Sequence, residues 1–334
     1  MWNTLRRMER DWAMFIKNIY SILQKELAYQ YHAKVFFILV IPLLIVSSGM
    51  IYVQYKTAES SYRQFLKTES EYRELGIDVK KALDSPVNVT EGTLKSGDGD
   101  GEIVENILRY DYEQLILSLH LIQPKQSVVA AMEWMGFIAL PLAFTLYAIY
   151  ISTYDNRFRT VKVKAARYDW KMVLLAKQCS VYIVMLVTTA AVLCLAYLAG
   201  LFFYALAART IPVDQFAVSV PSKSSMLSQW FVVLAVSFIF ATIGFYLGIL
   251  FRSFITPALL YIIYTLLVPV LGKFDLKNLL ANLGHAVFDF NGSFKLFTPE
   301  IVEIIPIMLI LLVFFGVFSV VAYYAAHRQS KYVV

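Results

Sequence analysis

The residues of this chain best suited to binding a partner are the basic and aromatic side chains between 155 and 171. The segment 153–177 reads TYDNRFRTVKVKAARYDWKMVLLAK, in which basic and apolar residues alternate. Tyr168 and Trp170 stand within it between Arg167 and Lys171. This pattern predicts a short cytosolic helix that docks into a groove of a partner protein. A solvated anchor beside anionic lipid would explain the charge of the segment but not its aromatic residues. The candidate docking residues are Asp155, Arg157, Arg159, Lys162, Lys164, Arg167, Tyr168, Asp169, Trp170 and Lys171.

Ionisable groups within a membrane are the usual mark of an ion or proton pathway. The middles of the apolar segments of this chain contain none. Glu133 and Glu303 lie at the outer ends of two apolar segments, and Lys177 lies at the inner edge of another. Two interpretations of the glutamates stay open: solvation at the membrane interface, or the rim of an outward exit. The uncharged middles argue against a proton-coupled secondary transporter.

Motifs for catalysis and metal binding are absent from the sequence. It contains no G-x-x-x-x-G-K-[ST] phosphate loop, no H-E-x-x-H, no C-x-x-C and no cluster of histidines. Cys179 and Cys194 lie in or beside one apolar segment, as small hydrophobic residues of a membrane core do. We therefore expect no catalytic residue, no metal site and no cofactor bound by this chain.

The composition indicates what kind of structure must position these residues. Of the 334 residues 59% are hydrophobic and 16% are charged, and the mean hydropathy is +0.60. Soluble domains average about 45–50% apolar and about 25% charged residues. We predict an all-α polytopic membrane protein, because the chain contains repeated apolar segments. Their lengths are close to the roughly 20 residues that a transmembrane helix needs. The six predicted spans are 35–52, 130–152, 180–206, 230–251, 255–271 and 304–325.

The distribution of lysine and arginine predicts the orientation. Sixteen lie in the segments on one side of the six spans and five lie on the other side, leaving aside the long loop 53–129. Cytoplasmic loops carry the excess of basic residues, whereas long loops translocate largely regardless of charge. Both termini are therefore predicted to be cytoplasmic, in a cell membrane that we expect to be the bacterial cytoplasmic membrane. The net charge of +6 needs no nucleic acid to explain it.

Two further segments have a predicted structure of their own. Residues 1–34 are predicted to form an amphipathic helix in the headgroup region, with an apolar stripe facing lipid; a cytosolic helix packed on a partner is the alternative. Its stripe includes Trp12, Phe15, Ile16, Ile19 and Leu23. The extracytoplasmic loop 53–129 is predicted to hold helices at Tyr55–Leu83 and Glu102–Leu121 that fold back on each other, around a glycine-rich stretch at 90–101. A disordered loop is the alternative there.

Small residues recur along the fourth span. Gly244 and Gly248 form a G-x-x-x-G pair, and Ala241 lies one turn earlier. Small residues on one face let helix backbones approach closely in lipid. Packing within one bundle and a seam between two copies both fit this pattern.

The arrangement resembles the ABC-2 type permeases, the membrane subunits of ABC exporters. The similar features are the amphipathic helix 12–29, the long outer loop after span 1, the basic loop 155–177 and the end of span 4 at Tyr246–Ser253. The segment 272–300 also lies where that family places short helices that re-enter from outside. The larger outer loop departs from the minimal plan of the family.

The resemblance implies a function. Such a permease pairs with a second copy or a homologue and with two ATPase subunits, which bind ATP and Mg²⁺. Residues 159–171 would be the coupling segment, and residues 12–29 would be a connecting helix resting on the ATPase. An amphipathic substrate is expected: a peptide, an antibiotic or a lipid-like molecule. The alternatives are a sensor or scaffold with a ligand-binding outer loop, and an ion exporter or secondary transporter.

Overall fold

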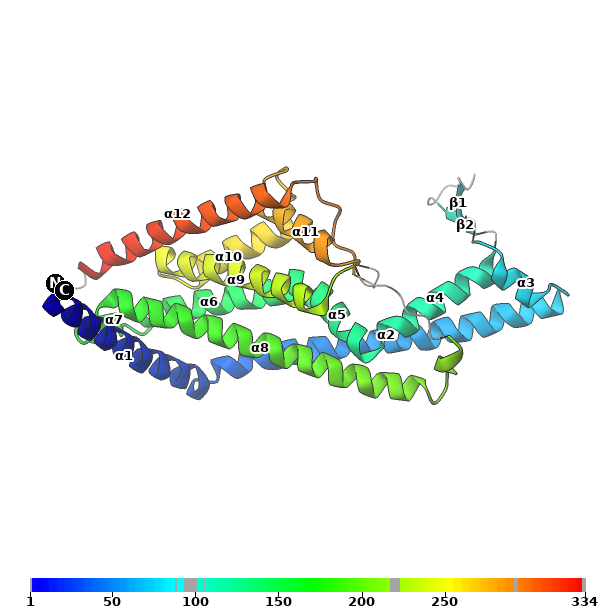
Figure 1. Cartoon of the computed structure of the whole chain (residues 1–334), viewed down its shortest axis with the longest axis horizontal. Coiled ribbons are helices and arrows are strands. Elements are labelled where there is room, and N and C mark those ends of the chain that lie inside the picture. The colour runs from blue at the N-terminus through cyan, green and yellow to red at the C-terminus, as the bar shows by residue number, and fades with distance from the viewer. Residues whose placement is uncertain are drawn as a thin grey trace. The chain divides into compact units, whose positions relative to one another are not determined.

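The computed structural model describes residues 2–87, 89–92, 101–104, 106–216, 223–290 and 294–331, most of them in helices (Figure 1). Within these described residues, five helices are long and apolar enough to cross a membrane, by length and composition. The chain is thus a polytopic helical membrane protein. It divides into two compact units: unit 1 comprises Met1–Ile45, Met132–Val192 and Ser222–Val334, and unit 2 comprises Val46–Ala131 and Leu193–Pro221.

Five of the six predicted spans lie on these long helices. They are α2 (Val35–Glu74), the continuous helix formed by α5 (Pro124–Trp134), a π-helical turn (Met135–Ala139) and α6 (Leu140–Arg157), α8 (Trp170–Ala207), α9 (Met226–Phe251) and α12 (Ile304–Lys331). The predicted span 255–271 falls on α10 (Ile255–Ile262) and a second π-helical turn (Ile263–Leu267). Together these are shorter than a membrane span, so a sixth crossing stays a prediction.

The small residues of α9 pack within unit 1. A Cβ atom added to Gly244 would lie 2.6 Å from the Thr145 carbonyl oxygen on α6, and one added to Gly248 would lie 3.1 Å from the Ile149 carbonyl oxygen. Ala241 is buried on the same helix. The two helices approach this closely because glycine presents no side chain. Packing within one bundle is therefore confirmed for this stripe.

A short helix, α11 (Leu276–Val287), lies between the π-helical turn at Ile263–Leu267 and α12. Asp275 caps its first turn, where the carboxylate accepts a hydrogen bond of 3.1 Å from the Lys277 amide. Asn278 and Asn282 donate side-chain hydrogen bonds of 2.9 and 2.8 Å to the Glu300 carbonyl. The segment 272–300 thus contains the short helix that the resemblance implied, and its depth in the membrane stays a prediction.

Unit 2 contains the part of α2 after Val46, α3 (Val79–Asp84), α4 (Ile107–Leu121) and a hairpin of β1 (Val89–Gly92) and β2 (Gly101–Val104). Phe65 of α2 and Leu108, Leu115 and Leu119 of α4 share one hydrophobic core. The Thr68 hydroxyl donates a 2.6 Å hydrogen bond to the buried Asp111 carboxylate. The predicted pair of packed helices is confirmed for these residues, and the disordered alternative is wrong for them.

Two details of the predicted loop are wrong. Residues 102–104 belong to β2, and the helix begins only at Ile107, where the Asn106 side chain accepts a hydrogen bond of 3.1 Å from the Arg109 amide. The first predicted helix ends at Glu74 instead of continuing to Leu83, and Gly76 follows it with a φ of 73°. A left-handed φ there favours glycine and ends the helix. Residues 93–100 of the glycine-rich stretch lie outside the described residues.

Candidate functional site

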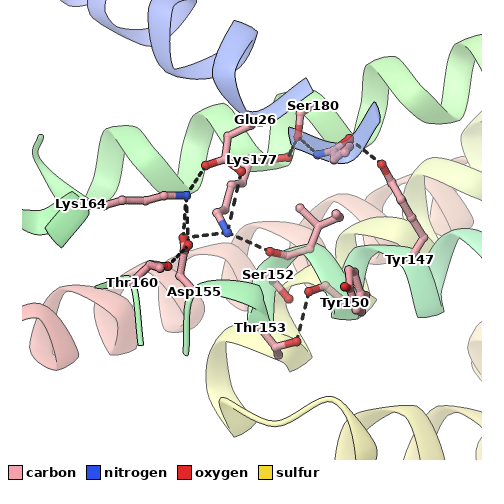
Figure 2. A network of polar contacts seen from close by, with 12 residues as sticks. Glu26, Tyr147, Tyr150, Ser152, Thr153, Asp155, Thr160, Lys164, Lys177 and Ser180 are labelled. Carbon is pink, nitrogen blue, oxygen red and sulfur yellow. Dashed lines mark hydrogen bonds and ion pairs between the residues drawn. The ribbon is translucent and has the colours of Figure 1, made fainter. Parts of the chain in front are cut away.

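Four charged side chains from four helices of unit 1 meet in one network (Figure 2). Glu26 lies on α1 (Trp2–His32), Asp155 near the end of α6, Lys164 on α7 (Val161–Ala165) and Lys177 near the start of α8. Two carboxylates therefore face two ammonium groups. The network joins segments of the chain that lie up to about 150 positions apart, so it is a tertiary feature rather than a local one.

Each carboxylate contacts both lysines. The Lys177 ammonium lies 2.8 Å from an Asp155 carboxylate oxygen and 4.0 Å from Glu26. The Lys164 ammonium lies 2.5 Å from Glu26 and 3.0 Å from Asp155. Lys177 also donates to the Ile151 carbonyl at 3.0 Å, and the Thr160 hydroxyl donates to Asp155 at 2.6 Å. Lys177 and Asp155 thus receive further hydrogen-bond partners from α6 and from the turn after it.

Burial makes this arrangement costly to disturb. The side chains of Asp155 and Lys177 are each 1% exposed, and Glu26 is 6% exposed. An unpaired charge in such surroundings is strongly unfavourable. Removing one partner of a buried ion pair typically costs about 3–5 kcal/mol. The network therefore defines one relative placement of α1, α6, α7 and α8.

Lys164 is the most exposed member of the network, and its protonation follows from its partners. Burial alone lowers the pKa of the Lys164 ammonium, but the carboxylates of Glu26 and Asp155 outweigh that effect and raise the pKa above its ordinary value. Lys164 therefore stays charged at neutral pH.

A second set of hydrogen bonds lies beside the charges. The Tyr147 hydroxyl on α6 donates to the Gln30 side-chain oxygen at 2.5 Å, and the Gln30 amide donates to the Ser180 hydroxyl on α8 at 2.8 Å. Ser180 in turn donates to the Lys177 carbonyl at 2.7 Å. Gln30 follows Glu26 by one turn of α1, so one face of that helix joins both sets.

The buried face of α1 differs from the predicted apolar stripe. Among the side chains of α1 that the structure describes, those of residues 15–32, the buried ones are Ile22, Glu26 and Gln30, and they recur every four positions. Among the predicted stripe residues, Phe15, Ile19 and Leu23 are half-buried, Ile16 is exposed, and the side chain of Trp12 lies outside the described residues. The helix is confirmed, but its polar and charged side packs on its own chain. The signal available in the sequence was this four-residue spacing, together with Lys177 at a span edge.

The two aromatic residues of the basic loop are engaged within the chain. Trp170 is 9% exposed, so its predicted docking into a partner is wrong. The Tyr168 hydroxyl accepts a 3.1 Å hydrogen bond from Lys25, whose ammonium lies 5.5 Å from the ring centre. This hydrogen bond lowers the pKa of the Tyr168 hydroxyl. Tyr168 thus links the loop to α1.

The other loop residues divide between caps and exposed charges. Asp169 accepts a hydrogen bond of 3.0 Å from the Lys171 amide at the start of α8. Four further basic residues are exposed: Arg157, Arg159, Lys162 and Arg167. The large apolar residues exposed on this loop are Phe158, 51% exposed, and Val163, 66% exposed. Sequence reasoning missed both, because it weighted the aromatic pair at 168 and 170.

The two glutamates at the predicted outer ends have different surroundings. Glu133 is buried, and its carboxylate accepts a hydrogen bond of 3.1 Å from the Phe290 amide. Interfacial solvation is therefore wrong for Glu133. Glu303 is exposed just before α12, and no described contact joins the two side chains. The rim of an outward exit stays a prediction.

Comparison with known proteins assigns this chain to no family. Searches of protein families, of curated proteins and of solved structures each found no match to the chain. Among the described residues, no group of three or more histidine, cysteine, aspartate or glutamate side chains is placed to hold a metal ion. The class that fold and site define is a polytopic helical membrane protein with a buried charge network at one end of unit 1. Its function is inferred from that network.

Proposed function

We propose that this chain is the permease subunit of an ATP-binding-cassette exporter in the bacterial cytoplasmic membrane. It would move an amphipathic substrate, such as a peptide, an antibiotic or a lipid-like molecule, while a separate subunit hydrolyses ATP. The observation that carries the proposal is the network of Glu26, Asp155, Lys164 and Lys177. It fastens α1 and the basic loop to two long apolar helices.

A partner that moves this loop would move the membrane helices with it. Lys164 on α7 is paired with Asp155 on α6, and Asp155 is paired with Lys177 on α8. Slippage at either pair would leave a buried charge without its partner, which is strongly unfavourable. Displacement of α7 is therefore passed to the adjoining ends of α6 and α8. This is the connection that a transporter with a separate ATPase requires.

The surface of the loop supports docking of a protein partner. Phe158 and Val163 are exposed apolar side chains, and the Arg157 guanidinium lies 5.5 Å from the centre of the Phe158 ring. Aromatic residues and arginine are enriched at protein interfaces and at their energetic centres. The contact surface is thus assigned to Phe158 and Val163, in place of the aromatic pair at 168 and 170.

The path of the chain supports an even number of crossings. Helix α1, helix α7 and the end of α12 lie at the same end of unit 1 (Figure 1). A chain that starts and finishes at one end of the bundle crosses it an even number of times. Five long helices with α10 as a short additional crossing give six, and the basic residues of these segments favour the cytoplasmic side for that end.

Affinity purification from the native membrane tests the proposal. Full-length tagged chain should retain an ATP-hydrolysing protein in about a two-to-two ratio. Val163→Asp should reduce the retained ATPase by about 30-fold, because a residue at the energetic centre of an interface contributes about 2 kcal/mol or more. Leu75→Asp is the matched control, since Leu75 is a similarly exposed apolar residue of unit 2 and should retain the ATPase.

Two results would contradict the proposal. One is a purification of intact wild-type chain from native membranes in which no ATP-hydrolysing protein is retained. The other is Val163→Asp chain that retains as much ATPase as wild type. If a small ligand bound to unit 2 is recovered instead, the sensor alternative is favoured.

A further inference from the structure

A cavity of about 400 Å³ opens in unit 1 beside the start of α2. Three parts of the unit form its walls: the first turns of α2, the middle of α6, and Phe254 just before α10. Tyr147, Tyr150 and Phe254 contribute aromatic rings to the wall, and the other lining residues are aliphatic. The Tyr150 ring packs on Phe254 with ring centres 6.2 Å apart. A predominantly apolar ligand fits such walls.

The cavity is elongated along the helix axis. It is lined along α2 from Val35 to Leu43, a rise of about 12 Å at 1.5 Å per residue. One leaflet of a bilayer contributes about 15 Å of hydrocarbon, half of a core of about 30 Å. Because α2 begins at Val35, the cavity extends from a membrane boundary toward the middle. Its length therefore matches an acyl chain of one leaflet.

Two basic residues stand at the boundary end of the cavity. Lys34 lies between the lining residues Ala33 and Val35, and Arg252 lies two positions before the lining residue Phe254. Both are exposed, and among the described residues neither side chain has a hydrogen-bond or ion-pair partner. Each follows a helix with a left-handed φ, 59° at Lys34 and 53° at Arg252. Two unpaired cations thus lie where an apolar ligand would present its headgroup.

We propose that this cavity binds one acyl chain of an anionic phospholipid, whose phosphate pairs with Lys34 and Arg252. A cation near the membrane surface favours anionic lipid by about fivefold, so two should favour it by about 25-fold. The ligand is a component of the bilayer, so the site does not depend on the identity of the transported substrate or on the ATPase. It lies beside the charge network, because the Tyr147 ring lines the cavity while its hydroxyl donates to Gln30.

Photolabelling of the full-length chain in vesicles tests the proposal. Phosphatidylglycerol with a diazirine on one acyl chain is compared with phosphatidylcholine carrying the same chain, and labelled peptides are identified by mass spectrometry. We expect labelling at residues 35–43 and 143–150, about 25-fold stronger with phosphatidylglycerol. Lys34→Gln with Arg252→Gln should abolish that preference. Arg328→Gln, which removes another exposed basic residue, should retain it.

A second variant separates the acyl chain from the charges. Ala143→Trp places an indole in the cavity and should reduce labelling at 35–43 by at least about tenfold while leaving Lys34 and Arg252 in place. Equal labelling by both lipids, or labelling of α12 as strong as that of the cavity, would overturn the proposal. A disulfide between two copies of the Ile38→Cys variant, together with loss of lipid labelling at the cavity, would also overturn the proposal. A second copy of the chain would then occupy the cavity.

Discussion

Replacing Lys177 with methionine tests whether the buried charges hold the helices of unit 1 together. Methionine retains an unbranched apolar chain but lacks the ammonium group. The change leaves the Asp155 carboxylate, 1% exposed, without its partner at 2.8 Å and leaves Glu26 dependent on Lys164. The expected cost is about 3–5 kcal/mol. At 1.36 kcal/mol per tenfold change, local opening should become about 150- to 5,000-fold more frequent.

Cysteine labelling measures this opening. Cys179 lies two positions after Lys177 and is half-buried, so its reaction with a maleimide reports opening near the start of α8. The exposed Cys194 is first replaced with alanine to leave one reporter. Lys162→Met is the control, because Lys162 is an exposed lysine of the same loop. Its labelling rate should change by about twofold at most, as expected for a surface substitution within about 0.5 kcal/mol.

The double variant Asp155→Leu with Lys177→Met sharpens the test. Replacing a buried pair by apolar residues is often close to neutral, so this variant should recover most of the lost protection. The reasoning is refuted if Lys177→Met labels at the wild-type rate, or if Lys162→Met is accelerated as much. It is also refuted if the double variant is less protected than Lys177→Met alone, because the cost would then arise from packing rather than from an unpaired charge.

Three further predictions follow from contacts elsewhere in the chain. Gly244→Ala should destabilise the chain by about 1–3 kcal/mol in thermal unfolding, because the new methyl meets an α6 carbonyl at 2.6 Å; Gly316→Ala, with open space around it, should not. The ultraviolet difference spectrum between wild type and Tyr168→Phe, followed through an alkaline titration, should show that the Tyr168 phenolate forms below the usual tyrosine pKa. Lys25→Met should move this ionisation of Tyr168 to higher pH. Burial raises the pKa of Asp275, but hydrogen bonds from a tyrosine hydroxyl and two backbone amides outweigh it and hold the pKa below its usual value. Wild type should therefore be more stable to unfolding than Asp275→Asn at neutral pH. In an acid titration of stability, this difference should be lost as the pH falls below about 3.9.

Hydropathy predicted the membrane helices because it depends on local composition. A long apolar segment must satisfy its backbone hydrogen bonds internally, and a helix does so whatever surrounds it. The ends of the helices were less predictable. Helix α2 continues to Glu74, where i,i+4 pairs such as Arg73 with Glu69 and packing against α4 stabilise it beyond the apolar part.

The charge network could be predicted only in part. Asp155 and Lys164 were candidates because they lie in one basic loop, and the structure brings both into the network. Glu26 and Lys177 come from distant parts of the chain, and nothing local specifies that they meet. A lysine at the edge of a span needs a partner, so Lys177 indicated that an acidic group lay nearby. The identity of the carboxylates that pair with Lys177 depends in part on how α1 packs, which the sequence does not specify.

Trp170 shows why an exposed binding residue cannot be assigned from its type. An aromatic residue between two basic residues fits an interface, and it fits equally well a helix start that packs on its own bundle. The structure favours the second, since the side chain is buried. Val163 lacks the aromatic signal and is exposed. Residue type alone could not show which side chain of the loop is exposed, because exposure is set by the tertiary fold.

The basic residues that predicted the orientation have at least two different roles in the structure. The positive-inside rule counts each lysine and arginine equally. Lys164 and Lys177, however, neutralise the carboxylates of Glu26 and Asp155, so this part of the excess is cancelled inside the protein. Exposed residues such as Arg159 and Arg167 keep an unbalanced positive charge at the surface. The same short loop therefore fixes the ends of the membrane helices through its two paired lysines and presents a basic surface through its exposed basic residues.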